Sequence, residues 1–303
     1  MCRGFSDFAR MTRGMAFATL KIKFLKRQKG IQMQNQDIGH IIVGIDFSKY
    51  SKIVVKEAQK LSETMNVPIT YCYAYEYFQT LGGTVDEFVL KMKFQIRKVY
   101  KLSENPKIIV QMGDPAEQLI EIAKKIEQAP LIIVGHKGYS KLARFFLGST
   151  AEKVATLSPF PVWIHRGRRA LLPKRILIPS DLTEQTDRAL SQVKSFESSV
   201  HPSLELYHVI PNPIPMLDFT VHKEMVKQIN DEDNKNFSNF SKTHPDLKMI
   251  RSHGNILDKV EKKSKGFDIV ALSPRDKNRR NPLLGKVATK LIRSVNKPIL
   301  ICP

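Results

Sequence analysis

The chain carries one set of landmarks twice, and this repetition limits its architecture more than any other feature of the sequence. An apolar run ends on a carboxylate in each half, Asp46 in HIIVGID and Asp181 in RILIPSD. Each half then has, in the same order, a glycine before an Asp or Asn, a glycine before a helical pattern, and a proline before a closing apolar run: Gly113, Gly148 and Pro161, then Gly254, Gly285 and Pro298. A repeat of about 130 residues has the size of a whole domain and exceeds solenoid periods. The sequence therefore predicts two copies of one domain.

Within each copy, short apolar runs alternate with helical patterns. The runs of the first copy are 40–46, 69–75, 107–111, 131–134 and 161–165. Such dense apolar runs are typical of strands that are buried on both faces of a parallel sheet. Regular alternation of strands and helices predicts crossover connections with helices on both faces of the sheet. We therefore predict an α/β fold of two tandem doubly wound parallel sheets with five strands each.

The length of 303 residues also indicates two domains, because single domains of this size are uncommon. We place the first domain at 38–166, a linker at 167–174 and the second domain at 175–303. Residues 1–37 form a basic extension without a helical or strand period, and we expect it to be disordered. Residues 1–32 are either an over-extended start of the reading frame or a basic tail that binds membrane or nucleic acid.

The composition bears on partners and location. The net charge of +20 could attract polyanions, but a solvated lysine-rich surface accounts for it, and we expect no nucleic-acid partner. No apolar stretch is long enough to span a membrane. Three scattered cysteines, Cys2, Cys72 and Cys302, fit a reducing compartment, and we expect a cytoplasmic protein. The sequence has no Walker A motif, no G-x-G-x-x-G, no nucleophile elbow and no metal-ligand spacing, so it predicts no catalytic or metal site.

Residues 131–150, LIIVGHKGYSKLARFFLGST, carry the strongest functional signal. The apolar run enters Gly135, Gly138 follows, and Gly148-Ser149-Thr150 precedes the next helical pattern. Glycine lets the backbone lie close to a ligand, and the N–H groups at a helix N-terminus bind anions. The stretch predicts a phosphate-binding loop at the carboxyl end of a strand. The alternative is a tight strand-to-helix connection that binds nothing.

The spacing Gly135-x2-Gly138-x9-Gly148-Ser149 resembles the nucleotide-binding signature of the universal stress protein family. The strand ending on Asp46, the GDPAE turn at Gly113 and the SPFPV entry at Ser158 are similar to that family too. The resemblance covers residues 38–303 as two tandem domains. It implies a Rossmann-like stress-response protein that binds ATP, with or without Mg.

The resemblance also assigns site residues. It implies that Asp46 contacts the adenosine end of ATP, that the backbone near Ala74 contacts the adenine, and that Gly135 lies by the ribose. It implies that the phosphates are held by backbone N–H groups and hydroxyls of Gly138, Gly148, Ser149 and Thr150. Members of the family pair through their last strands, so 161–165 and 298–301 are expected to meet in an intramolecular pseudo-dimer, with a homodimer as a further option.

Two polar residues have a second interpretation. Asp46 is either a nucleotide contact or a helix N-cap or the ion-pair partner of a nearby lysine. His136 is either a phosphate contact or general base, or a solvent-exposed bystander.

The second copy departs from the motif. Aligned without gaps from Gly285, it has three replacements: Gly135 by Leu272, Gly138 by Arg275 and Ser149 by Lys286. Side chains would then stand where close backbone approach is needed, and Pro274 removes an N–H donor. We predict that only the first domain keeps an open nucleotide site. The second is expected to be a structural partner or to hold another ligand.

The leading hypothesis is a regulatory ATP-binding protein. Two alternatives stay open. One is a nucleotide-independent interaction scaffold, and the other is a slow ATPase that uses His136 or Lys137 near the γ-phosphate, although no residue resembles a positioned base.

Overall fold

The computed structural model describes residues 37–76, 84–136, 147–167, 172–212, 219–273 and 285–303. The basic extension up to residue 36 lies outside these residues, as do the predicted site residue Gly138 and its neighbour Lys137, and Pro274 and Arg275 of the second half. Residues 37–303 form one compact unit. None of the described helices is both long and apolar enough to cross a membrane.

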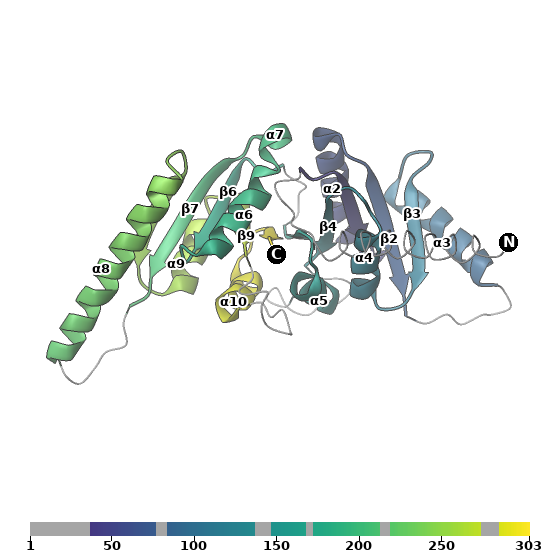
Figure 1. Cartoon of the computed structure of the whole chain (residues 1–303). Coiled ribbons are helices and arrows are strands. Elements are labelled where there is room, and N and C mark those ends of the chain that lie inside the picture. The colour runs from purple at the N-terminus through teal and green to yellow at the C-terminus, as the bar shows by residue number, and fades with distance from the viewer. Residues whose placement is uncertain (1–36, 77–83, 137–146, 168–171, 213–218, 274–284) are drawn as a thin grey trace, which may run out of the picture. The chain divides into compact units, whose positions relative to one another are not determined.

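The first half alternates strands and helices (Figure 1). Its elements are β1 (His40–Gly44), α2 (Ser51–Met65), β2 (Ile69–Tyr75), α3 (Val85–Tyr100), β3 (Lys107–Met112), α4 (Pro115–Lys124), β4 (Pro130–Gly135), α5 (Ser149–Leu157) and β5 (Val162–His165). Local chemistry explains why α4 begins at Pro115. The Asp114 carboxylate accepts a hydrogen bond from Glu117 N–H at 2.9 Å, and proline at the first helical position has no N–H to leave unpaired.

The second half repeats this order with one extra short helix. Its elements are β6 (Arg175–Ser180), α6 (Glu184–Lys194), α7 (Glu197–Val200), β7 (Ser203–Ile210), α8 (Phe219–Thr243), β8 (Lys248–His253), α9 (Ile256–Ser264), β9 (Ile269–Leu272), α10 (Lys286–Ser294) and β10 (Ile299–Ile301). Asn255 caps α9 as Asp114 caps α4, because its side chain accepts hydrogen bonds from Leu257 N–H and Asp258 N–H.

The strands form one sheet in the order β3-β2-β1-β4-β5-β10-β9-β6-β7-β8. All pairs within a half are parallel, and β5 and β10 pair antiparallel across the middle. The prediction of two parallel five-stranded units is confirmed. The two units share one hydrogen-bonded sheet, because their last strands pair as the resemblance implies.

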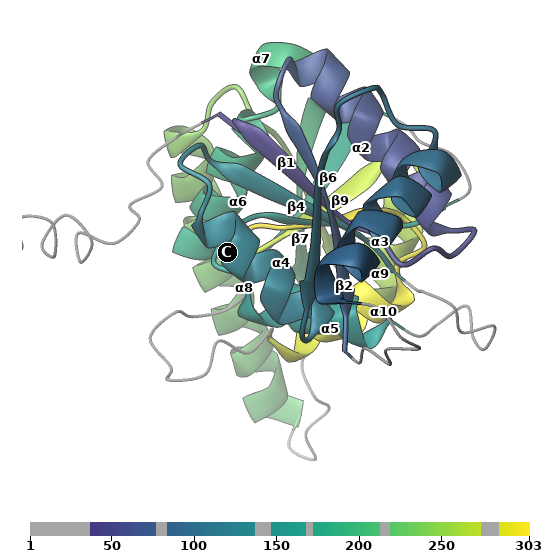
Figure 2. The same ribbon diagram turned by 90° about the vertical axis from the view of Figure 1, so that its right-hand side faces the viewer.

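The sheet of the first half is covered on both faces, as a doubly wound sheet requires (Figure 2). Ile41 and Val43 of β1 share an apolar core with Val54 and Ala58 of α2. On the other face, a Cβ added to Gly44 would lie 3.0 Å from a methyl group of Leu119 in α4. Helices α2 and α4 therefore lie against opposite faces of the same strand.

The repetition extends to unusual backbone angles. Three pairs of corresponding residues have positive φ: Phe47 (59°) with Leu182 (58°), Asn66 (52°) with His201 (48°), and Gly113 (132°) with Gly254 (137°). A positive φ is uncommon for residues other than glycine, so its recurrence at the same points of the two halves is independent evidence that they repeat one structure.

Candidate functional site

A cavity of about 530 Å³ lies at the carboxyl ends of β1, β2 and β4. Ligands of open α/β sheets bind at this edge. The structure brings together there all the predicted site residues that it describes: Asp46, Ala74, Gly135, Gly148, Ser149 and Thr150. The remaining predicted residue, Gly138, lies outside the described part of the chain.

Asp46 follows β1 and turns back on its own backbone. Its Oδ1 accepts a hydrogen bond from Ser48 N–H at 3.0 Å, and the Ser48 hydroxyl accepts one from Ser51 N–H at 3.0 Å, where α2 begins. Ser48, and not Asp46, thus supports the start of the helix. Among the described residues, the Ser48 N–H is the one hydrogen-bond donor to the Asp46 carboxylate, so Oδ2 can accept a hydrogen bond from a ligand.

Gly135, at the end of β4, makes room for an aromatic ring. A Cβ at this position would lie 3.1 Å from Cδ1 of Tyr50 and 3.3 Å from Cγ2 of Val54. The Tyr50 ring also lines the cavity, and its hydroxyl donates to the His165 carbonyl at 3.1 Å. The absence of a side chain at Gly135 therefore positions Tyr50 as one wall of the cavity.

The N-terminus of α5 provides the anion-binding chemistry of the cavity. Gly148 is its N-cap and has no side chain to accept a hydrogen bond, so among the described residues no side chain caps the first N–H groups of the helix, which have no intrahelical acceptor either. Ser149, Thr150 and Ala151, the first three helical residues, line the cavity. The positive end of the helix dipole and two hydroxyl groups therefore meet there.

His136 is not a solvent-exposed bystander, because it is only 9% exposed. Its Nδ1 lies 3.3 Å from the His165 carbonyl, and its ring packs edge-on against Tyr50 with centroids 4.8 Å apart. Its backbone carbonyl accepts a hydrogen bond from Gly148 N–H at 2.7 Å. His136 thus lies behind the Tyr50 wall and fixes the start of α5 through its backbone.

Residues 38–166 match the Universal stress protein family. The chain is 28% identical over 145 residues to Universal stress protein YxiE of Bacillus subtilis, which covers 42% of this chain and 97% of that protein. It is 29% identical over 136 residues to Universal stress protein MJ0531 of Methanocaldococcus jannaschii, which covers 41% of this chain and 79% of that protein. Residues 38–166 are a universal stress protein domain.

The likeness in fold extends beyond this domain. A solved universal stress protein from Archaeoglobus fulgidus superposes with a TM-score of 0.57 and covers 89% of this chain and 98% of its own. Its sequence is 18% identical, so the comparison shows a shared fold over both halves.

Several residues that line the cavity of the universal stress protein domain were not predicted from the sequence. They are chiefly Tyr50, Ser51, Cys72, Tyr73, Pro115 and Leu119. Pro115 and Leu119 follow the GDPAE turn, so the position of that turn beside the sheet edge could have indicated them. Burial raises the pKa of the Cys72 thiol to about 12, so this cysteine is a neutral wall residue.

The second half aligns with the universal stress protein domain differently from the gapless comparison. Ile41 pairs with Leu131, and the corresponding Ile176 pairs with Ile269. Counting along the strands from these pairs places Ser273 at the position of Gly135. The predicted replacement of Gly135 by Leu272 is therefore wrong. Ser273 precedes Gly285 by 12 residues, whereas Gly135 precedes Gly148 by 13, so a count back from Gly285 misses the register by one residue.

Ser273 supplies the hydrogen bond that Tyr50 supplies in the first half. Its hydroxyl donates to the Cys302 carbonyl at 3.0 Å. Gly135 pairs with His165, and Leu272 pairs with Ile301, so the next residue after Ile301, Cys302, corresponds to His165. Gln185 stands at the position of Tyr50. The two halves thus satisfy equivalent carbonyls from different residues.

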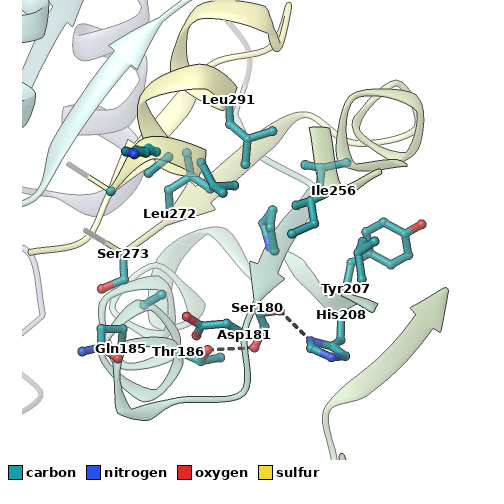
Figure 3. A pocket seen from close by; sticks show the side chains of 18 of the residues that line it. Ser180, Asp181, Gln185, Thr186, Tyr207, His208, Ile256, Leu272, Ser273 and Leu291 are labelled. Atoms are coloured by element: carbon teal, nitrogen blue, oxygen red, sulfur yellow. Dashed lines mark hydrogen bonds between the residues drawn. The ribbon is translucent and has the colours of Figure 1, made fainter. Parts of the chain in front are cut away.

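The second half also keeps a cavity of about 530 Å³ at the corresponding sheet edge (Figure 3). The prediction that only the first half has an open site is therefore wrong with respect to volume. The linings differ at the helix start, where Lys286 and Val287 replace Ser149 and Thr150. Chemistry, and not the presence of space, distinguishes the halves.

Proposed function

We propose that the universal stress protein domain binds ATP as a regulatory ligand in its cavity. The observation that carries the proposal is that the uncapped N-terminus of α5 and the Asp46 carboxylate line the same cavity. One end offers N–H and hydroxyl donors for phosphates, and the other offers an acceptor for ribose hydroxyls or an adenine amino group. A volume of about 530 Å³ is within the range of small-molecule sites.

In this proposal, the residues divide the nucleotide between them. Asp46 and the backbone near Ala74 hold the adenosine, and Gly135 with the Tyr50 ring forms the wall by the ribose. Gly148, Ser149 and Thr150, with Gly138, hold the phosphates, where Mg can accompany them. Binding changes the surface that this domain offers to a protein partner.

The position of His136 disfavours the ATPase alternative. Its ring contacts Tyr50 and the His165 carbonyl, and it is not among the described residues that line the cavity. A general base must reach the proton that it abstracts, directly or through one water. Lys137, the other candidate, lies outside the described residues.

The test is a charge change at the start of α5, Ser149→Glu, with Lys286→Glu at the corresponding position as the matched control. Both sites are exposed, and a glutamate in the first turn favours the helix, so both variants should fold. We expect Ser149→Glu to weaken ATP binding at least about 100-fold in calorimetry, because a carboxylate then faces the phosphates.

Lys286→Glu should leave the affinity for ATP unchanged. Wild-type protein that carries no nucleotide by mass spectrometry and shows no heat with ATP and Mg would support the scaffold alternative instead. ADP formation that is lost in His136→Ala would support the ATPase.

A further inference from the structure

We propose that the cavity of the second half binds an amphipathic anion, a small molecule with an apolar body and one carboxylate. This proposal does not depend on ATP binding in the first half. It rests on the walls of the cavity, the charge at one end of it and the state of its other polar groups.

The walls are mainly apolar, and their apolar side chains come chiefly from β7, β9, α9 and α10. Leu272 ends β9, Val209 lies in β7, Ile256 and Val260 lie in α9, and Leu291 lies in α10. Figure 3 shows Leu272, Leu291 and Ile256 together on one side, with Asp181, Gln185 and Thr186 grouped on another. Burying an aliphatic or aromatic body against such walls favours binding in proportion to the apolar surface removed from water.

The charge that selects an anion is at the start of α10. Gly285 is the N-cap and offers no side-chain cap, and the first turn contains no acidic residue. Lys286 adds a full positive charge at the positive end of the helix dipole, an arrangement that is unfavourable by itself. Among the described residues, no carboxylate pairs with Lys286. A bound carboxylate would offset both charges at once.

The other polar groups of the cavity are already engaged. The Ser180 and Thr186 hydroxyls bond each other at 2.7 Å, and Ser273 donates to the Cys302 carbonyl. His208 lies between the Ser180 carbonyl, 2.8 Å from Nδ1, and Asp233 Oδ1, 2.6 Å from Nε2. Because of these pairs, few donors and acceptors are left to form hydrogen bonds with the hydroxyl groups of a sugar. The cavity therefore favours a ligand whose body makes apolar contacts.

Asp181 fixes the orientation of the ligand. Its Oδ1 accepts a hydrogen bond from the Thr183 hydroxyl at 2.6 Å, and its negative charge repels a carboxylate from that part of the cavity. The anionic head therefore lies by Lys286 and the N–H groups of α10, and the body lies over Leu272 and Leu291.

The experiment is a calorimetric titration of the full chain with sodium decanoate, with decanol as the uncharged probe. We expect one decanoate per chain, weaker binding of decanol, and affinity that rises roughly fourfold per methylene from hexanoate to decanoate. Lys286→Glu should weaken decanoate binding at least about tenfold, because it replaces an attractive charge by a repulsive one. Lys290→Glu, the same charge change one turn along α10 and outside the lining, should have little effect.

Ser149→Glu separates this proposal from the proposed function. It should weaken ATP binding at least about 100-fold and leave decanoate binding intact. The amphipathic-anion site would be refuted by absence of decanoate binding, by equal losses in Lys286→Glu and Lys290→Glu, or by affinity independent of chain length. Displacement of decanoate by ATP from the Ser149→Glu protein would also refute it, since the cavity would then accept a nucleotide.

Discussion

At the scale of single residues, the two halves solve one packing problem in two ways. At the first cavity, Gly135 has no side chain, the Tyr50 ring fills the space, and the Tyr50 hydroxyl donates to the His165 carbonyl. In the second half, the Ser273 hydroxyl donates to the equivalent carbonyl, that of Cys302, and Gln185 stands at the position of Tyr50. The exchange of a glycine for a serine is therefore coupled to a change on a different element.

This coupling predicts a rescue. Gly135→Ser should destabilise the protein by about 1–3 kcal/mol, because its Cβ would press on Tyr50. Tyr50→Gln should cost about 2–4 kcal/mol, because it leaves a void and removes one of the hydrogen bonds to the His165 carbonyl, which keeps the one from His136 N–H. The double variant reproduces the second half, and its loss should be well below the sum of the two.

Urea unfolding of the four proteins in a double-mutant cycle measures the coupling. Additive losses would show that Ser273 and Gln185 are not an alternative to Gly135 and Tyr50.

At the scale of elements, one buried arginine joins the halves. Arg166 follows β5, is 5% exposed, and donates to the Val295 carbonyl at 2.5 Å and to the Ile292 carbonyl, so that it caps the C-terminus of α10. Burial lowers the pKa of its guanidinium to about 10, which still leaves it charged at neutral pH. Helix α10 thus has one end fixed by the first half and the other end in the cavity of the second.

We expect Arg166→Gln to reduce the free energy of unfolding by about 3–5 kcal/mol, since buried carbonyls would lose a charged donor. Arg293→Gln is the matched control. It removes the exposed pair of Arg293 with Glu152, 2.6 Å apart on the same junction, and should cost less than about 1 kcal/mol. Equal losses in denaturant unfolding would contradict a capping role for Arg166.

The elements themselves were largely predictable. The strand ends, the turns at Gly113 and Gly254 and the helix starts at Gly148 and Gly285 follow from apolar runs, glycine and capping residues, which act locally. Which residue of the second half corresponds to Gly135 was not predictable from one sequence. A difference of one residue in the connection to the next helix shifts the alignment of β9 on β4 and leaves both strands as apolar runs. The Tyr50 wall was missed because its neighbours Gly135 and His165 are distant in sequence.

At the scale of the whole molecule, the two halves share the same sheet edge and differ in the residues that line it. Both halves have a cavity of about 530 Å³ beside a helix start. Ser149 and Thr150 face one cavity, and Lys286 and Val287 face the other. We infer two sites of different chemistry in one continuous sheet, linked through β5, Arg166 and α10.

The most direct test of this account is the stoichiometry of ATP binding to the full chain, measured by calorimetry in the presence of Mg. The account predicts one ATP per chain, lost in Ser149→Glu and retained in Lys286→Glu. Two ATP molecules per chain, or one that is lost in Lys286→Glu and kept in Ser149→Glu, would contradict it.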